Sequence, residues 1–483
     1  MSNEDPMFDD FTKAFAYIRK ESLDIYNRLH SIEEDVAFIE QAHKAYPNAP
    51  LLRSCPNLRC GAWYTDPSYA THVPAYFKST DGHNNNWSFN LRRANLHLIP
   101  LIIERKGIIL VDSTRSGKRI PDALSKTVPI WCAVINRAML LRYPALGQGR
   151  AESCWNVALY TPPSTVSRQE HHQIELRLDD WARDLAGSSF ALPIIPRPLR
   201  PVWITPATSA FPNISFDEKQ DVEFIPVVCV SASKQVDQGL ERRAGGFSYI
   251  QGSGDDHELW GAGLTPELFW ANHSRLLAAE RTQLPAIVSE IVSRQPKTPS
   301  IYRAQNAATP VNTVGGRLLL ASLAEIPEPS NDQGDIIYIL LTSTTVADSV
   351  STKTQHHIPV VSGKKGQSHF LQTILPDAMK IISESLYNNK NVCVACETGK
   401  DISVGVVLAA LQLYFGDDGS LSSASVDTAG AKVNATVPNK NSIRTRLQWI
   451  IESRPEANPS RAVLKRVNEF LLTSPAFRER PAS

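Results

Sequence analysis

The stretch at residues 392–414, VCVACETGKDISVGVVLAALQLY, is the most informative segment for the fold class. Its apolar residues up to Cys396 predict a buried strand, ETGKD predicts a glycine-containing turn, and a helix is expected to begin near Ile402. A turn of this kind leaves backbone N–H groups pointing outward, where they can bind an anion. The predicted anion-binding loop spans 396–405 and comprises Cys396, Glu397, Thr398, Gly399, Lys400, Asp401, Ile402, Ser403 and Gly405.

The segments around this loop alternate between strand and helix patterns. DIIYILLT and VCVACE have the apolar runs of buried strands, whereas FLQTILPDAMKIISESLYNN and ISVGVVLAALQLYF have helical patterns. Such alternation predicts an α/β fold. An ordinary strand-to-helix turn that binds no ligand is the alternative for the loop itself.

The length of 483 residues predicts more than one domain. Proline-rich stretches occur at 191–212 and at 294–316, and the main boundary is expected in the second stretch because proline disfavours regular hydrogen-bonded structure. We predict an N-terminal mixed α/β region at 1–295, a linker at 296–330 and a C-terminal α/β domain at 331–483. The N-terminal region is expected to start with amphipathic helices at 7–45.

The loop at 396–405 resembles the phosphate-binding loop of the cysteine phosphatases, in which a Cys is followed by five residues, an Arg and a Ser or Thr. Aligning Cys396 with the nucleophile puts Ile402 at the arginine position and Ser403 after it. The arginine holds the transferring phosphoryl group through two hydrogen bonds, and isoleucine cannot do so. The sequence therefore predicts anion binding without phosphatase turnover.

Net charge, cysteine spacing and the lengths of the apolar runs limit the partners and the cellular compartment that the sequence predicts. The 50 basic and 49 acidic residues nearly cancel, so a polyanionic partner can be indicated only by local clusters of charge. Among the seven cysteines, Cys55 and Cys60 have no second pair at zinc-site spacing, and reduced thiols are expected. The start of the sequence is acidic rather than signal-like, and no apolar run approaches the roughly 20 residues of a membrane span. We expect a cytoplasmic protein, with the nucleus possible, and no membrane partner.

Basic residues cluster in two parts of the chain. From Trp87 to Tyr143 there are ten Lys or Arg against three Asp or Glu, and the last 53 residues hold ten against four. Basic clusters beside aromatic residues are typical of surfaces that bind nucleic-acid phosphates, although a solvated face is the alternative. The candidate cations are Arg92, Arg93, Arg115, Lys118, Arg119, Lys126, Lys440, Arg444 and Arg446.

Several acidic residues and one histidine are candidates for catalysis. GIILVDSTRSGK predicts a buried strand that ends at Asp112, and α/β sheets expose catalytic groups at the carboxyl ends of their strands. Asp81 and His83 lie in STDGH, where Asp and Gly also favour a simple turn. The acidic segment at 255–258, DDHE, offers oxygen ligands for Mg²⁺ or forms a solvated turn.

Four blocks look like the signature blocks of the initiator-tRNA 2′-O-ribosyl phosphate transferases of fungi and plants. The blocks are STDGHNNNWSFNLRRANLHL, IILVDSTRSGKRIPDALSKTVPIWCAVINRA, GGFSYIQGSGDDHELWGAGLTPELFW and ACETGKDISVG. They occur in order over most of the chain. The missing arginine agrees with this resemblance, since the C-terminal domain of that family resembles a dual-specificity phosphatase without being a phosphatase.

The resemblance implies a glycosyltransferase. It would transfer the 5-phosphoribosyl group from 5-phosphoribosyl 1-pyrophosphate to the ribose 2′-OH of purine 64 in initiator methionine tRNA, with Mg²⁺ as cofactor. The modified tRNA would be marked for initiation and excluded from elongation. No obligate protein partner is implied.

The resemblance also suggests roles for the candidate residues. Asp112, Asp122 or Asp81 would stabilise the ribosyl centre or act as the base, with His83 as a second candidate base. Arg115, Lys118, Arg119 and Lys126 would hold pyrophosphate or the tRNA backbone. The loop at 396–405 would hold a phosphate of the donor, with Lys440, Arg444 and Arg446 nearby. Alternatively the donor binds at 107–119, and the C-terminal loop holds a tRNA phosphate or nothing.

Two rival functions remain open on the sequence. A cysteine-dependent RNA or protein phosphatase would use Cys396 as its nucleophile. A non-catalytic tRNA-binding protein would keep the C-terminal domain as an inactive phosphatase module. Both rivals predict that no ribosyl phosphate is transferred to tRNA.

Overall fold

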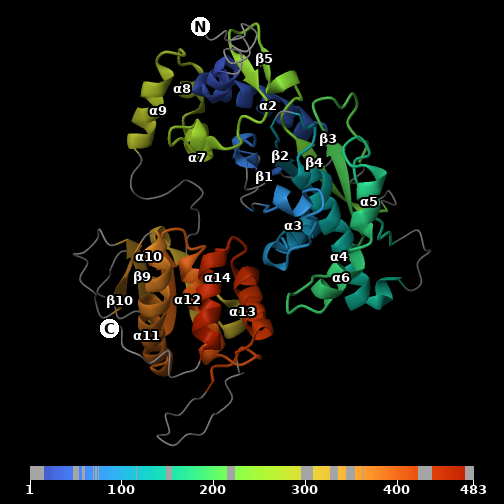
Figure 1. The fold of residues 1–483 in the computed structure, drawn as a ribbon. Coiled ribbons are helices and arrows are strands. Elements are labelled where there is room, and N and C mark those ends of the chain that lie inside the picture. Colours follow the sequence, from blue (N-terminus) through green and yellow to red (C-terminus); the bar gives the residue numbers. More distant parts are fainter. Residues whose placement is uncertain are drawn as a thin grey trace, which may run out of the picture. The chain divides into compact units, whose positions relative to one another are not determined.

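The computed structural model describes residues 16–46, 54–56, 60–68, 70, 73, 75–115, 117–147, 155–214, 223–294, 308–326, 335–343, 354–361, 363–422 and 438–473. The chain divides into two compact units (Figure 1). The first unit comprises Met1–Asn90, Ala94–Gly187 and Leu192–Tyr302, and the second comprises Leu91–Arg93, Ser188–Ala191 and Arg303–Ser483.

The first unit is built on a four-stranded parallel sheet with the order β1-β2-β4-β3. Its strands are β1 (Ser54–Pro56), β2 (Ile108–Asp112), β3 (Leu199–Ile204) and β4 (Ile225–Ser231). All side chains of β2 and β4 are buried. Continuous apolar strands suit a parallel sheet because both of its faces are covered. The predicted strand that ends at Asp112 is therefore confirmed.

Helices cover both faces of this sheet. The helices are α2 (Ile25–Lys44), α3 (Leu98–Arg105), α4 (Val128–Arg142), α5 (Arg168–Glu175), α6 (Leu178–Ala186), α7 (Pro266–Ala271), α8 (His273–Leu277) and α9 (Leu284–Ser293). One apolar core joins α2 and α7–α9 to alternate strand residues such as Ile109 and Val111, which share one face. Helix α4 packs against β3. An antiparallel pair, β5 (Leu240–Arg242) and β6 (Ser248–Ile250), completes the strands described in this unit.

The second unit contains a five-stranded sheet with the order β10-β9-β11-β8-β7, parallel except for the pair β7–β8. Its strands are β7 (Thr309–Pro310), β8 (Leu318–Ser322), β9 (Ile336–Ser343), β10 (Gln355–Val360) and β11 (Asn391–Cys396). Its helices are α10 (Lys364–His369), α11 (Leu375–Tyr387), α12 (Ile402–Tyr414), α13 (Lys440–Ser453) and α14 (Arg461–Leu472).

The predicted alternation of strands and helices is confirmed in this unit, since β9, α11, β11 and α12 occupy the predicted segments. Strands β7 and β8 lie inside the range 296–330, which the sequence analysis assigns to a linker. The apolar segment LLLAS pairs in parallel with β11 and so belongs to the sheet. Residues 296–307 and 327–330 of that range lie outside the described residues.

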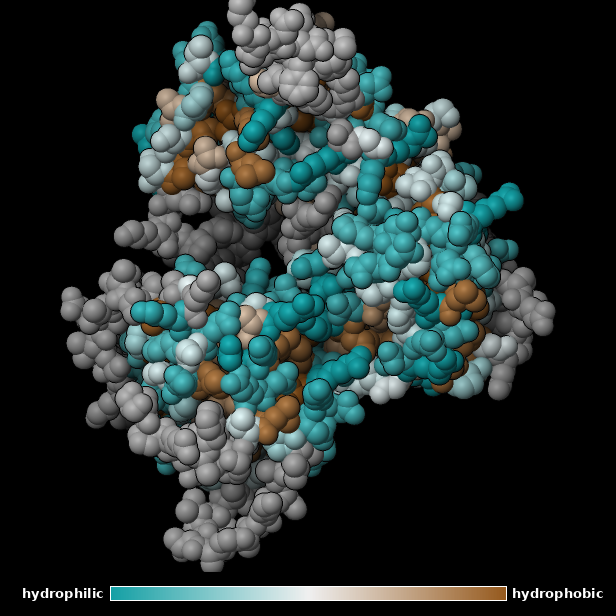
Figure 2. Space-filling model, in the orientation of Figure 1, coloured by the Kyte–Doolittle hydropathy of each residue, from teal (hydrophilic) through white to brown (hydrophobic). Residues whose placement is uncertain are grey.

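The predicted N-terminal helices are present where the chain is described, at 16–23 and in α2, while residues 7–15 lie outside that part. Figure 2 shows that hydrophilic residues cover most of the described surface on the face drawn, with apolar residues in scattered patches. Among the described residues, no helix is long and apolar enough to cross a bilayer.

Candidate functional site

The loops that follow β2 and β4 meet at the carboxyl edge of the first sheet. Gln251, which is 2% exposed, joins them through its side-chain amide. Its Nε2 donates to the carbonyl oxygens of Arg115 (3.0 Å) and Lys118 (2.7 Å), and its Oε1 accepts from the backbone N–H of Val236 (3.2 Å). A buried amide with both ends satisfied holds the loop after β2 in one conformation.

A pocket of about 630 Å³ lies beside this loop and brings five of the predicted site residues together. Its lining residues are His83, Asn84, Gly117, Lys118, Arg119, Asp122, Lys126, Ser164, Thr165 and Gln235. The carboxyl edge of a parallel sheet is the usual place for a ligand in α/β proteins. Cations, a histidine and a carboxylate therefore face one cavity at the position where a phosphorylated ligand is expected.

Asp122 is the centre of the charged network in this pocket. Its carboxylate pairs with Lys118 (2.5 Å) and Lys126 (2.9 Å), and His83 Nε2 lies 3.8 Å from Asp122 Oδ2. Burial alone would raise the pKa of Asp122, but the hydrogen bonds and charges of the two lysines outweigh burial, and the pKa lies below its usual value. Asp122 is thus held as an anion next to the imidazole.

Gly82 explains how His83 reaches this network. The 3-10 turn η2 (Ser79–Gly82) packs against the π-helical turn η4 (Ala123–Thr127). A Cβ at Gly82 would lie 2.7 Å from the carbonyl oxygen of Asp122 and 2.8 Å from Thr127 Oγ1. Only glycine allows this approach, so the STDGH turn has a tertiary reason for its glycine.

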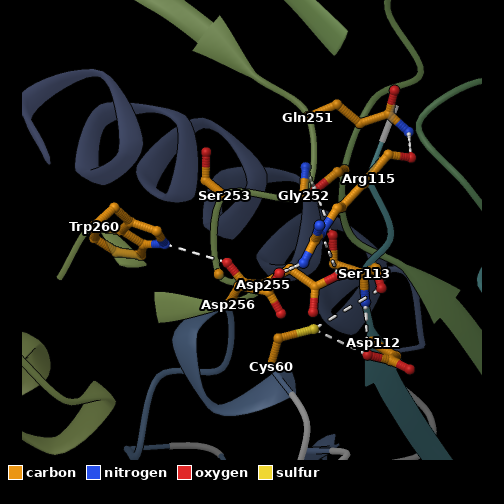
Figure 3. Close-up of polar contacts among 12 residues, drawn as sticks. Cys60, Asp112, Ser113, Arg115, Gln251, Gly252, Ser253, Asp255, Asp256 and Trp260 are labelled. Carbon is orange, nitrogen blue, oxygen red and sulfur yellow. Dashed lines mark hydrogen bonds and ion pairs between the residues drawn. The ribbon is translucent and has the colours of Figure 1, made fainter. Parts of the chain in front are cut away.

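A second pocket of about 370 Å³ shares Lys118 with the first and is lined by the acidic segment 255–258. Arg115 Nε lies 3.7 Å from Asp255 Oδ2, and the Arg115 guanidinium also pairs with Asp256. Figure 3 shows Arg115 directed toward these two carboxylates. A Cβ at Gly252 would lie 2.7 Å from the carbonyl oxygen of Thr114, so the acidic segment can lie this close to the loop after β2.

No group of three or more His, Cys, Asp or Glu side chains arranged to hold a metal ion occurs in the part of the chain that the structure describes. The acidic segment 255–258 therefore does not supply a complete set of protein ligands for Mg²⁺. Mg²⁺ usually keeps several waters and binds through one or two carboxylates together with substrate phosphates. Both pockets bring carboxylates next to cations, which suits a metal that arrives with a phosphorylated ligand.

The structure argues against a catalytic role for Asp112. Its side chain is fully buried and accepts from Cys60 Sγ (3.0 Å) and from the backbone N–H of Ser113 (2.9 Å; Figure 3). It lines neither pocket. Strand β2 does end at the edge of the sheet where the pockets lie. The side chain of Asp112, however, is directed into the protein interior, where it holds the loop after β2. Asp81 is also buried, accepts from the hydroxyl of Ser88 (3.4 Å) and lines neither pocket.

The loop after β11 has the geometry of an anion-binding cradle. Backbone N–H groups of Gly399, Asp401 and Ser403 donate to the sulfur of Cys396, whose Sγ lies 3.1 Å from Ser403 Oγ. Burial raises the pKa of the Cys396 thiol, but these hydrogen bonds outweigh burial and bring the pKa below its usual value. The position that carries arginine in cysteine phosphatases is Ile402, at the first turn of α12.

The remaining residues of this loop differ in exposure. Glu397, Thr398 and Lys400 are exposed, while Asp401 is half-buried and accepts from the backbone N–H of Ser460 (2.7 Å). Gly405 faces a neighbouring helix, because a Cβ there would lie 2.5 Å from a methyl group of Val463. Gly405 therefore serves helix packing, and the predicted role in phosphate binding is not supported.

The predicted basic residues of the second unit also separate into two kinds. Lys440 and Arg444 are exposed on α13. Arg446 on the same helix is fully buried, pairs with Asp417 (2.5 Å) and donates to the carbonyl oxygen of Phe415 (3.1 Å). Because its guanidinium is enclosed, Arg446 is a structural residue rather than a contact for tRNA or pyrophosphate. Arg92 and Arg93 lie half-buried in the short 3-10 turn Leu91–Arg93.

Several residues of the first pocket escaped the sequence analysis. Asn84, Ser164, Thr165 and Gln235 line it, and Glu170 supports it from helix α5. The sequence could have indicated Gln235 as a site residue, because it follows the buried strand β4 at the same sheet edge as the loop after β2. No sequence pattern indicates Ser164, Thr165 or Glu170, since they reach the pocket through tertiary contacts.

Two family models match the chain: the Rit1 N-terminal domain at residues 18–293 and the Rit1 DUSP-like domain at residues 354–471. The predicted dual-specificity-phosphatase-like C-terminal domain is thus confirmed. Solved structures resembling part of the chain include a mouse putative dual specificity phosphatase complexed with zinc tungstate. That structure is 14% identical, the match covers 38% of this chain and 96% of that one, and the TM-score is 0.26.

Two proteins match over nearly their whole length. The tRNA A64-2′-O-ribosylphosphate transferase of Saccharomyces cerevisiae is 33% identical, and the match covers 94% of this chain and 93% of the relative. An uncharacterized protein of Schizosaccharomyces pombe is 34% identical, with 93% and 94% covered. The predicted resemblance is therefore confirmed, and the chain belongs to the Rit1 family of tRNA ribosylphosphate transferases.

Proposed function

We propose that this chain transfers the 5-phosphoribosyl group from 5-phosphoribosyl 1-pyrophosphate to the ribose 2′-OH of purine 64 in initiator methionine tRNA. The family membership and the name of the yeast relative support the tRNA and the transfer. The observation that carries the chemistry is the pocket of about 630 Å³ in which His83, Asp122 and three cationic side chains face one cavity.

The pyrophosphate end of the donor suits the exposed cations of this pocket. Lys118 and Arg119 are exposed and line the cavity at the carboxyl edge of the sheet. Pyrophosphate gains negative charge as its bond to the ribosyl carbon breaks, and preorganised cations stabilise that charge in the transition state. This assignment adopts the alternative in which the donor binds beside the loop after β2.

His83 suits the role of general base. The proton of the attacking 2′-OH would pass to an imidazole nitrogen while the new bond forms from the 2′-oxygen to the ribosyl carbon and pyrophosphate leaves. The ionised Asp122, 3.8 Å away, would stabilise the imidazolium that results. Of the four predicted catalytic residues, only His83 and Asp122 line this pocket.

Mg²⁺ would enter the pocket on the pyrophosphate of the donor. When bound, it would neutralise the phosphate oxygens and so assist departure of the leaving group. Asp122 is the pocket carboxylate that could contribute an oxygen ligand, although its present partners are lysines.

The tRNA would contact exposed basic residues such as Lys440 and Arg444. An A-form stem is recognised through its shape, its phosphates and its 2′-OH groups rather than through base edges. The added anionic ribosyl phosphate would keep the initiator tRNA out of elongation, a role that fits a cytoplasmic enzyme.

One observation favours a second candidate function. The pKa of Cys396 is lowered inside a backbone cradle, which is the environment of a nucleophilic thiolate in phosphatases. Ile402 opposes this candidate, because no guanidinium stands there to grip the phosphoryl group. A phosphatase would release phosphate from a generic aryl phosphate, and Cys396→Ala would abolish that release.

The test is incubation of unmodified initiator tRNA with Mg²⁺ and donor labelled in its ribose. We expect incorporation of label at purine 64, none into an elongator methionine tRNA, and loss of incorporation in His83→Ala. Binding of initiator tRNA without incorporation would instead support a non-catalytic tRNA-binding protein. Phosphate release from an aryl phosphate without incorporation would support the phosphatase.

A further inference from the structure

Lys126 differs from the other cations of the pocket because its side chain is buried and its ammonium pairs with two carboxylates. Its ammonium lies 2.9 Å from Asp122 Oδ1 and 3.1 Å from Glu170 Oε1, and its side chain is 8% exposed. Lys118, which also pairs with Asp122, is 53% exposed. A lysine has three N–H donors, and two of those on Lys126 are directed at carboxylates. Lys126 therefore has little freedom to turn toward a ligand.

Glu170 is itself held in place from two directions. It lies on α5, where its backbone N–H donates to the N-cap hydroxyl of Ser167 (3.1 Å). Its Oε1 also accepts from the indole N–H of Trp87 (3.0 Å), and the guanidinium of Arg177 lies over the Trp87 ring at 5.2 Å. The side chain of Glu170 is 15% exposed. A carboxylate fixed in this way can hold the lysine that it binds.

The chain of contacts runs from Trp87 and Glu170 through Lys126 to Asp122, and from Asp122 to His83. Each member is fixed by the one before it, and only the last two face a reacting group in the proposed reaction. Because a small misplacement of a catalytic group can cost about 10²-fold in rate, such support has a measurable effect.

We infer that Glu170 is a positioning residue that fixes Lys126 against Asp122, so that Lys126 orients the carboxylate behind His83 instead of binding pyrophosphate. This inference rests on the proposed function, and it replaces the predicted role of Lys126 as a pyrophosphate ligand. Pyrophosphate is left to Lys118 and Arg119, the exposed cations of the same pocket.

The test compares Glu170→Gln with wild type in two assays on the full chain. One assay measures transfer of labelled ribosyl phosphate to initiator tRNA, and the other measures binding of Mg²⁺-pyrophosphate by calorimetry. We expect kcat to fall by about 10–100-fold, because the support of Asp122 is lost. Pyrophosphate affinity should fall by less than about twofold, because loss of an anion beside the pocket does not weaken anion binding.

A double-mutant cycle with Lys126→Met tests whether Glu170 acts through Lys126. In the Lys126→Met background, Glu170→Gln should lower kcat no further, and Lys126→Met alone should retain pyrophosphate affinity. Glu170→Asp keeps the charge and should recover part of kcat. Glu175→Gln, on the same helix and outside both pockets, is the matched control and should behave as wild type.

Three results would overturn the inference: an unchanged kcat in Glu170→Gln, additive effects in the cycle, or a loss of pyrophosphate affinity in Lys126→Met. The last result would make Lys126 a ligand-binding residue. Thermal melts identify a variant that fails to fold, and if Glu170→Gln does so, the transfer and pyrophosphate assays on Lys126→Met take its place: a lower kcat with retained pyrophosphate affinity is expected. If the wild-type protein binds pyrophosphate but transfers no label to tRNA, the proposed function fails. In that case the pyrophosphate-binding assay on Lys126→Met still decides whether Lys126 binds the ligand.

Discussion

The loops after β2 and after β11 both follow a buried parallel strand, and the sequence predicts phosphate binding at both. After β11, the groups that face the centre are backbone N–H donors of Gly399, Asp401 and Ser403, gathered around a thiol. After β2, the groups are side chains, with Lys118 and Arg119 facing a pocket that also holds His83. The same position in an α/β sheet thus presents two different sets of anion-binding groups, backbone donors in one unit and charged side chains in the other.

This difference between backbone donors and charged side chains indicates which of the two loops is suited to catalysing the transfer reaction. Backbone N–H groups supply partial charges in fixed positions, which is enough to bind an anion. The negative charge that develops on a leaving group and the removal of a proton call for full cations and a titratable base. The loop after β2 brings both together within the described residues of the first unit, and this contrast between the two loops leads to four predictions.

The largest effect is expected for His83→Ala. Removal of a general base lowers kcat by about 10²–10⁴-fold, and initiator tRNA should still bind because His83 is not a phosphate contact in the proposal. Single-turnover transfer of labelled donor measures the rate, and His172→Ala, an exposed histidine on α5, is the control. A rate within a few-fold of wild type would exclude His83 as the general base.

Lys118→Ala should raise the KM for the donor by about 10–100-fold. A charged hydrogen bond contributes roughly 1.5–3 kcal/mol, and about 1.4 kcal/mol corresponds to a factor of ten. Lys20→Ala, an exposed lysine on the helix at 16–23, should leave the KM for the donor unchanged. An unaltered KM in Lys118→Ala would mean that the cations after β2 do not hold the donor.

Gly82→Ala should destabilise the first unit by about 1–3 kcal/mol, the usual cost of inserting a methyl group into a close contact. The added Cβ would lie 2.7 Å from the carbonyl oxygen of Asp122 and would force η2 and η4 apart. A lower Tm with reduced transfer is expected. Gly147→Ala is the control, because its nearest neighbour would lie 3.7 Å away. A wild-type Tm in Gly82→Ala would contradict the contact.

The smallest effect on the donor is expected for Lys400→Ala in the loop after β11. If the donor binds in the first unit, its KM should change by less than about twofold, the range of an exposed charge that makes no direct contact. If this loop holds a tRNA phosphate, tRNA binding should weaken and its dependence on salt should fall by about one phosphate contact. A large rise in the KM for the donor would return the donor to the loop at 396–405.

Local sequence patterns predicted strands and helices well in both units. The apolar runs IILVD and VCVAC, and the helix that begins at Ile402, are confirmed because burial of continuous apolar segments depends little on distant contacts. The direction of a side chain is harder to predict. Asp112 ends its strand as expected, but Cys60 and the Ser113 N–H turn its carboxylate inward.

Arg446 and Lys126 show the same limit for basic residues. A cluster of cations in the sequence predicts an anion surface, but each cation can instead pair with a carboxylate from a distant segment. Arg446 pairs with Asp417, and Lys126 pairs with Glu170. Neither partner is recognisable from the sequence around the cation.

The sequence alone established the α/β class, the missing phosphatase arginine at Ile402 and the family, because these depend on local pattern and on residue identity. Tertiary structure was required to show which candidates share a cavity. His83 and Glu170 come from segments other than the one that carries Lys118 and Asp122, and Gly82 allows the close approach that joins His83 to the rest. The physical reason is that burial and ion pairing between distant segments, rather than local propensity, determine where a charged side chain points.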